Sequence, residues 1–198
     1  MNLLYPTMDI SRYLDKSNAS VYQIAYFSLK ISNNIYNEVA DLIECVELAK
    51  TDNIKFTVQR LLGEKARIYG KIPLRIDVPL ETKELAVWHQ DDFYVQGAPN
   101  ELTAWIPLQD TPMHMGALSV MKKSHHNGKL AHEFKWGKKS MPVGVYDLPV
   151  NIIEMKRGDV LLFNSFLLHT SNINFSALIR FSHLSPILLP NCKKILFI

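Results

Sequence analysis

The sequence predicts an α+β fold in which helices come first and a mostly β part follows, and two patterns indicate it. In the first third of the chain, apolar residues recur near the helical period over residues 17–29 and 31–50. From residue 72 onward, prolines and glycines separate short runs of β-branched and aromatic residues, which are typical of strands in a sandwich or barrel. At 198 residues we expect a single domain, with a helical part over 1–71 and a β-rich core over 72–198.

The individual elements can be placed from the same patterns. One more short helical piece is expected over residues 61–68, ahead of the first strand. A Gly-Asp turn at residues 158–159 comes directly before the last clear apolar run. The clearest predicted strands cover residues 74–78, 101–108, 117–121 and 160–168.

Composition and charge exclude several classes of protein. Hydrophobic residues make up 47% and charged residues 21%, as in an ordinary globular chain. The net charge is only +3 and the lysines are scattered, whereas nucleic-acid-binding proteins show a larger, clustered excess. Two cysteines make no disulfide framework, no apolar run is long enough to span a membrane, and the first residues lack the features of a signal peptide. We expect a soluble, cytoplasmic protein that binds neither nucleic acid nor membranes, and its oligomeric state stays open.

A His-x-Asp motif at His89 and Asp91 is the first indication of a metal site. In a strand, residues two apart point to the same face, so these side chains can converge on one ion. The pair alone is weak evidence, but His169 follows the apolar run over 160–168 and supplies a third ligand. Two imidazoles and one carboxylate, with open positions left, form the facial triad of non-haem Fe(II) oxygenases. We therefore predict His89, Asp91 and His169 as metal ligands and as the catalytic centre.

Two further residues fit an oxygenase that uses 2-oxoglutarate as co-substrate. The distal carboxylate of 2-oxoglutarate needs a buried cation, and the planar guanidinium of an arginine binds a carboxylate in a bidentate manner. Arg180 is expected on the strand after His169. Ser171 lies two residues after His169, on the same face if the strand continues, and could share that carboxylate.

These motifs together resemble the phytanoyl-CoA dioxygenase family. The pieces occur in the family's order over residues 72–183, and Arg180 follows His169 by eleven residues. One departure is that Lys122 and Lys123 stand where the family usually has Pro-Gly before Ser-His, so we expect a differently shaped middle loop. The matching pieces are residues 88–91, 103–108, 116–120, 124–125, 158–160 and 169–171, with Arg180.

The resemblance implies a fold, cofactors and roles for these residues. The fold would be the double-stranded β-helix, with iron bound by His89, Asp91 and His169 and 2-oxoglutarate held by Arg180 and Ser171. The enzyme would use Fe(II), 2-oxoglutarate and O2, and it would release succinate and CO2 while hydroxylating its substrate. Related halogenases have a small residue in place of the carboxylate ligand, so the aspartate at this position indicates hydroxylation.

The substrate is predicted from fewer residues. Arg75 and Asp77 alternate on one face of the predicted 74–78 strand, and surface ion pairing is the simpler interpretation, although Arg75 could also bind a substrate anion. Phe93 and Tyr94 lie just past the metal ligands and either line the pocket or pack in the core. Trp105 is a strand aromatic for which the same two interpretations are open. The other histidines have no partner at ligand spacing. We expect a small anionic or zwitterionic metabolite.

Two rival functions stay open at this point. One is a nucleic-acid repair dioxygenase of the same broad fold, which would need a basic groove with stacking aromatics. The other is a binding protein that keeps the fold but has lost catalysis. A cupin fits less well, because its metal motif normally begins with His-x-His.

Overall fold

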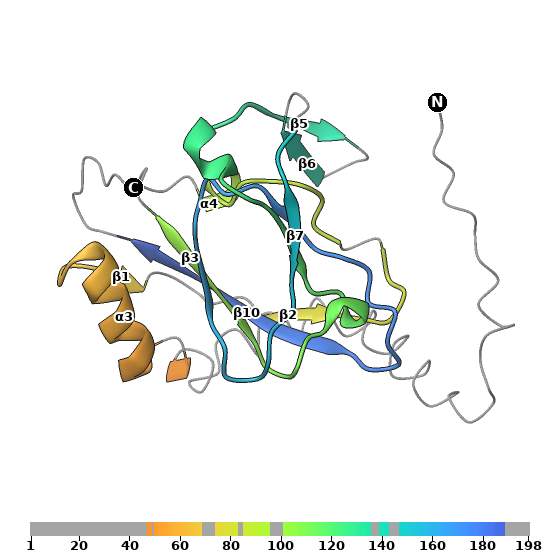
Figure 1. Cartoon of the computed structure of the whole chain (residues 1–198), viewed down its shortest axis with the longest axis horizontal. Helices are drawn as coiled ribbons and strands as arrows, with labels where there is room; N and C mark the ends of the chain where they lie inside the picture. Colours follow the sequence, from red (N-terminus) through yellow and green to blue (C-terminus); the bar gives the residue numbers. More distant parts are fainter. Residues whose placement is uncertain are drawn as a thin grey trace, which may run out of the picture.

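The computed structural model describes residues 47–48, 50–68, 74–82, 85–95, 101–135, 139–142 and 147–188. The predicted helix over 17–29 and nearly all of the helix over 31–50 lie outside the described residues. The described part is mostly β, with short helices between the strands (Figure 1). None of the helices in this part of the chain is long and apolar enough to cross a membrane.

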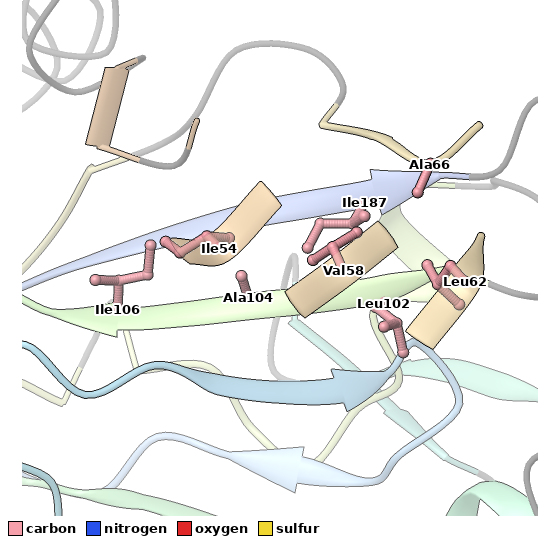
Figure 2. Packing of buried hydrophobic residues seen from close by; sticks show 8 residues of the cluster. All are labelled: Ile54, Val58, Leu62, Ala66, Leu102, Ala104, Ile106 and Ile187. Carbon is pink, nitrogen blue, oxygen red and sulfur yellow. The ribbon is translucent and has the colours of Figure 1, made fainter. Parts of the chain in front are cut away.

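Helix α3 (Asp52–Leu62) forms because its apolar residues recur every fourth position and face the same side. Ile54, Val58 and Leu62 are buried, and Figure 2 shows them packed over strands β3 and β10. The helix ends at Gly63, whose φ of 92° is unfavourable for residues with a side chain. The prediction of a helical piece over 61–68 is therefore wrong: the chain turns after Leu62 and begins strand β1 (Arg67–Ile68).

The larger sheet has five antiparallel strands in the order β1-β10-β3-β8, with β2 also paired to β10. All six residues of β3 are buried, because helix α3 covers one face of this strand and the second sheet covers the other. The bounds confirm the strands predicted over 74–78 and 101–108. They are β2 (Leu74–Asp77), β3 (Leu102–Pro107), β8 (Leu161–Asn164) and β10 (Arg180–Leu188).

The smaller sheet has three strands in the order β7-β4-β9. Strand β4 (Leu118–Met121) confirms the prediction over 117–121, and it lies between β7 (Val150–Ile153) and β9 (His169–Thr170). A hydrophobic cluster joins the two sheets. It contains Trp105, Leu118, Val120, Met155 and Phe163.

The strand predicted over 160–168 is too long, because the chain turns in its middle. The backbone N–H of Phe166 donates to the side chain of Asn164, and Leu167 N–H donates to the Asn164 carbonyl. A short asparagine side chain that bonds the backbone two residues on is typical of a turn. The turn carries the chain from β8 in the larger sheet to β9 in the smaller one, so His169 begins a new strand.

The remaining elements connect these strands. Helix α4 (Asp92–Val95), the 3₁₀ helix η4 (Ser124–Asn127) and the hairpin of β5 (His132–Lys135) and β6 (Lys139–Pro142) lie at the same end of the molecule (Figure 1). A second 3₁₀ helix, η3 (Met113–Met115), precedes β4. The β5–β6 hairpin pairs with neither of the two sheets.

Candidate metal centre

The three residues predicted as ligands converge. His89, Asp91 and His169 are buried, and each offers a ligand atom within 4.8 Å of the others. Both histidine Nε2 atoms lie 3.4 Å from Asp91 Oδ1. The backbones of the two histidines exchange N–H···O bonds of 3.0 and 3.1 Å, which places their side chains side by side from segments 80 residues apart in the sequence.

The geometry differs in one respect from the expected strand. Of the two residues in the His-x-Asp motif, His89 makes a β-bridge with His169, while Asp91 lies in the turn that leads into helix α4. The backbone bonds Phe93 N–H to Gln90 O and Tyr94 N–H to Asp91 O form that turn. The aspartate therefore reaches the histidines by reversal of the chain rather than by alternation along a strand.

Hydrogen bonds to the backbone set the tautomers of both histidines. His89 Nδ1 lies 2.6 Å from the Val87 carbonyl, and His169 Nδ1 lies 3.0 Å from the Leu167 carbonyl. Because a carbonyl can only accept, Nδ1 must carry the proton in each ring, and the Nε2 lone pair is left for a metal. The Thr103 hydroxyl donates to Asp91 Oδ2 over 2.5 Å, so that Oδ1 faces the two rings.

The charges of the three groups favour cation binding. Burial opposes ionisation of Asp91, but the two histidines, His169 above all, hold the pKa of this carboxyl well below its usual range. Burial lowers the pKa of His89, and the charge of His169 lowers it further. Burial also lowers the pKa of His169, but the charge and hydrogen bond of Asp91 outweigh burial, so the pKa of His169 is raised overall. Asp91 is therefore an anion at neutral pH and can compensate a buried positive ion.

A small cavity adjoins this trio. Arg75, Trp105 and Ser171 line it together with His89 and His169. Trp105 is also nearly fully buried in the cluster between the sheets, so both interpretations of this residue hold. Arg75 faces the cavity and also pairs with Asp77 at 3.0 Å, which confirms that the two residues share a face.

Arg180 lies in a buried ionic cluster at strands β2 and β10 and is not among the residues that line the cavity. It is fully buried, and its Nη2 and Nε lie 2.6 and 3.2 Å from Asp77 Oδ2. Burial raises the pKa of Asp77, but the two arginines outweigh it and lower this pKa overall. Arg180 Nη1 is buried without a hydrogen-bond partner. It lies beside Gly116, where a Cβ would come within 3.2 Å of it.

Several residues that support the centre were not predicted from the sequence. The side chain of Gln90, between the two ligands of the motif, donates to the carbonyls of Gly128 and Phe166 and accepts from Leu130 N–H, each over 2.8 Å. The Ser124 hydroxyl accepts from Leu168 N–H over 2.7 Å, one residue before His169. Thr103 could have been found from its position two residues before Trp105, on the same face of a predicted strand.

A buried carboxylate lies close to the metal ligands without joining them. Glu101 is fully buried, and neither of its carboxylate oxygens has a hydrogen-bond partner. Burial, followed by the charges of Asp91 and Asp92, raises the pKa of Glu101 to about 7. The protonated form of this side chain therefore predominates at acidic pH, and the group titrates near neutral pH.

Comparison with known families decides the assignment. The phytanoyl-CoA dioxygenase family matches the chain over residues 9–182, a span that includes all three converging side chains. The chain belongs to the phytanoyl-CoA dioxygenase family. The resemblance read from the motifs of residues 88–91 and 169–171 is thus confirmed.

The chain matches two curated relatives over only part of their length. The 1-deoxypentalenic acid 11-beta-hydroxylase of Streptomyces exfoliatus is 29% identical over 132 residues, which are 60% of this chain and 47% of the relative. The corresponding hydroxylase of Streptomyces arenae is 31% identical over 131 residues. The chain therefore spans about half the length of the curated relatives it matches.

Solved structures of similar fold include a monooxygenase and an epimerase. The non-heme monooxygenase ThoJ matches with a TM-score of 0.61 and 21% identity over 71% of this chain and 53% of its own. The epimerase SnoN, solved with Fe3+, alpha ketoglutarate and nogalamycin RO, matches with a TM-score of 0.61 and 16% identity over 88% of this chain and 75% of its own. At such identities the likeness shows a shared fold, which is mostly β and jelly-roll-like.

Proposed function

We propose that this chain carries the active site of a non-haem Fe(II) oxygenase that uses 2-oxoglutarate and O2, hydroxylates a small organic acid and releases succinate and CO2. Its core would be the double-stranded β-helix. The observation that carries the proposal is the convergence of His89, Asp91 and His169, whose ligand atoms lie within 4.8 Å of one another, with both Nε2 atoms 3.4 Å from Asp91 Oδ1.

The donor set fits iron in this role. Two neutral imidazoles and one carboxylate occupy one side of a metal and leave the other positions open, which is the arrangement of non-haem Fe(II) oxygenases. Asp91 also fills the position that chloride would need in a halogenase. The backbone carbonyls of Val87 and Leu167 and the hydroxyl of Thr103 support the ligands from behind, as outer partners of metal ligands usually do.

The arginine cluster fits the co-substrate. Arg180 and Arg75 both pair with the carboxylate of Asp77, so this cluster carries two guanidinium groups close to the cavity. The buried Nη1 of Arg180 lacks a partner, and an unsatisfied buried donor is costly unless a ligand completes it. Ser171 lines the cavity next to the metal ligands and would share the co-substrate's carboxylate with Arg180.

The residues of this chain would divide the work as follows. Bound iron would supply the oxidising chemistry, coupled to decarboxylation of the 2-oxo acid. His89, Asp91 and His169 hold the metal, and Arg180 with Ser171 orients the co-substrate by its distal carboxylate. Trp105, with its apolar neighbours Leu118 and Phe163, lines the cavity and excludes water from the reacting centre.

The substrate would be recognised next to the metal. Arg75 is the cation that faces the cavity, so a carboxylate or phosphate of the substrate suits it. Phe93 and Tyr94 follow the ligands on helix α4, and the Tyr94 ring packs edge-on against His89 at 5.3 Å between centroids. The curated relatives are named as hydroxylases of an acid, which agrees with an anionic substrate.

The experiment is succinate release from 2-oxoglutarate by the purified chain, measured with and without Fe(II) under air. We expect iron-dependent succinate from the wild type and none above background from Asp91→Ala or His169→Ala. Gln59→Ala, on the distant helix α3, serves as a control and should keep the wild-type rate.

Two outcomes would contradict the proposal. Fe(II) binding without succinate release, under any substrate tried, would favour the silent binding protein. Equal succinate release by wild type and His169→Ala would show that the reaction does not occur at this centre.

A further inference from the structure

An aromatic surface begins at the metal centre and continues to the β5–β6 hairpin. Tyr94 contacts the ring of His89, and Phe93 packs edge-on against Tyr94 at 5.2 Å. Phe93 in turn contacts Phe134 of β5 at 5.7 Å and stacks on His132 at 4.8 Å. We call Phe93, Tyr94 and Phe134 the aromatic rim.

The rim is exposed although it is apolar. Tyr94 is 52% exposed and Phe134 is 64% exposed. Phe134 lies on a two-stranded hairpin that pairs with neither sheet, so it is not needed to complete a core. Contiguous exposed apolar groups next to a functional site mark binding surfaces, whereas single ones are ordinary. Phe175 is exposed to a similar degree, 67%, but no other aromatic ring packs against it among the described residues.

The polar groups around the rim are already engaged. Both ring nitrogens of His132 have partners, since Nδ1 bonds the Leu130 carbonyl at 2.9 Å and Nε2 accepts from Gln90 N–H at 3.2 Å. Asp92 pairs with Lys129 at 2.8 Å. Two of the polar side chains beside the rim in the described part of the chain are therefore already paired, whereas an apolar ligand would cover rings that now face water.

We propose that the substrate is an amphipathic acid whose apolar carbon skeleton rests on Phe93, Tyr94 and Phe134 while its carboxylate points toward Arg75. This inference rests on the proposed function and names the substrate class for that same site. Phe134 then acts as a specificity-determining residue brought to the metal centre by the hairpin. The aromatic rim and Arg75 are joined through His89, which contacts Tyr94 and shares the cavity with Arg75.

The test measures binding rather than turnover, so that it stands apart from the proposed function. Three probes are titrated into the protein with and without Zn(II) plus 2-oxoglutarate, and followed by saturation-transfer NMR and calorimetry. Cyclohexylacetate carries both an apolar ring and a carboxylate, cyclohexylethanol lacks the carboxylate, and glycerate lacks the ring. The variants are Phe134→Ala, Phe134→Leu and the equally exposed control Phe175→Ala.

We expect cyclohexylacetate to bind more tightly than either of the other probes. Loss of the Phe134 ring should weaken its binding about fivefold to tenfold, as expected for one partly covered aromatic side chain. Phe134→Leu should recover most of that loss, and Phe175→Ala should bind like the wild type. Arg75→Gln should weaken binding of the acid but not of the alcohol.

Three results would overturn the inference. Glycerate could bind as tightly as cyclohexylacetate, or cyclohexylacetate could fail to bind at all. Phe134→Ala could bind cyclohexylacetate as tightly as Phe175→Ala does. This outcome, together with a dimer that Phe134→Ala dissociates, would show that a second copy of the chain covers the rim. Failure of the proposed function would look different, because succinate would be missing while the binding pattern stayed the same.

Discussion

The metal end and the arginine end of the site differ in how completely their polar groups are partnered. At the metal end, both Nδ1 atoms and Asp91 Oδ2 have hydrogen-bond partners within the chain. At the arginine end, two guanidinium groups share Asp77, and Arg180 Nη1 has no partner. The chain thus supplies hydrogen-bond partners that hold the metal ligands in place, whereas Arg180 at the other end keeps a buried donor that suits an anion.

The largest effect is expected at the arginine end. Asp77→Asn leaves two buried or half-buried cations without their carboxylate, and removing one partner of such a pair typically costs about 3–5 kcal/mol of unfolding free energy. Urea unfolding measures the loss. Added 2-oxoglutarate should restore part of it in the variant, because its carboxylate replaces that of Asp77.

Asp110→Asn is the matched control, since its carboxylate accepts a backbone N–H in an exposed position. It should lose less than about 1 kcal/mol. Equal losses of unfolding free energy in the two variants would mean that Asp77 stabilises the fold no more than an exposed aspartate does.

Near the metal ligands, Glu101 is a buried residue whose carboxylate oxygens have no hydrogen-bond partner. Its pKa is raised from 4.5 to about 7 in the folded protein, so between these values the folded state holds more protons than the unfolded one. The contribution of Glu101 to stability therefore falls as pH rises through this window. In metal-free protein, Glu101→Gln should match the wild type at pH values below the window and be more stable by roughly 3 kcal/mol above it.

Urea unfolding across this pH range checks the difference between the two proteins. A constant difference at all pH values would mean that Glu101 is not protonated in the folded state.

A smaller loss of unfolding free energy is expected from Gln90, whose hydrogen bonds connect the metal end to the loops around it. Gln90→Ala leaves three half-buried backbone groups without their partner, which costs about 2 kcal/mol. Because Gln90 lies between two ligands, metal affinity should also fall roughly tenfold to a hundredfold. Gln59→Ala, whose side-chain bond is exposed, should change neither. Calorimetric metal titration beside urea unfolding separates the two effects; normal metal affinity in Gln90→Ala would show that the ligands are held without it.

The smallest effect is expected in the middle loop. Lys123 has a φ of 66°, a left-handed conformation that glycine adopts without strain, and glycine is what the family usually has there. Lys123→Gly should stabilise the protein by about 0.5–1 kcal/mol. Lys122→Gly, one residue earlier and without a positive φ, should give no gain. The midpoint of thermal unfolding distinguishes the two.

The parts predicted from sequence are those that depend on local patterns. Strands β2, β3 and β4 followed from short apolar runs, and the ligand trio followed from a motif and one further histidine. The pairing of Asp77 with Arg180 joins residues 103 positions apart, and no spacing in the sequence indicates it. The partners of Gln90 likewise depend on loops that only the folded chain brings together.

Helix α3 and the turn after β8 were not predicted, although both have local causes in the sequence, because the prediction followed the apolar pattern. Helix α3 has a regular apolar face, but the glycine that ends it stood inside the predicted piece over 61–68. The turn after β8 interrupts a run that is apolar on both sides, and the only signal for it is the Asn164-Ser165 pair.

The central claim is that His89, Asp91 and His169 bind Fe(II) in the same site as 2-oxoglutarate. Anaerobic addition of both to the purified chain should produce a visible charge-transfer absorption that neither produces alone. His169→Ala should lose this absorption, and Arg180→Met should need much more 2-oxoglutarate to reach it while still binding iron. Absence of the band in wild type with iron bound, or its persistence in His169→Ala, would contradict the account.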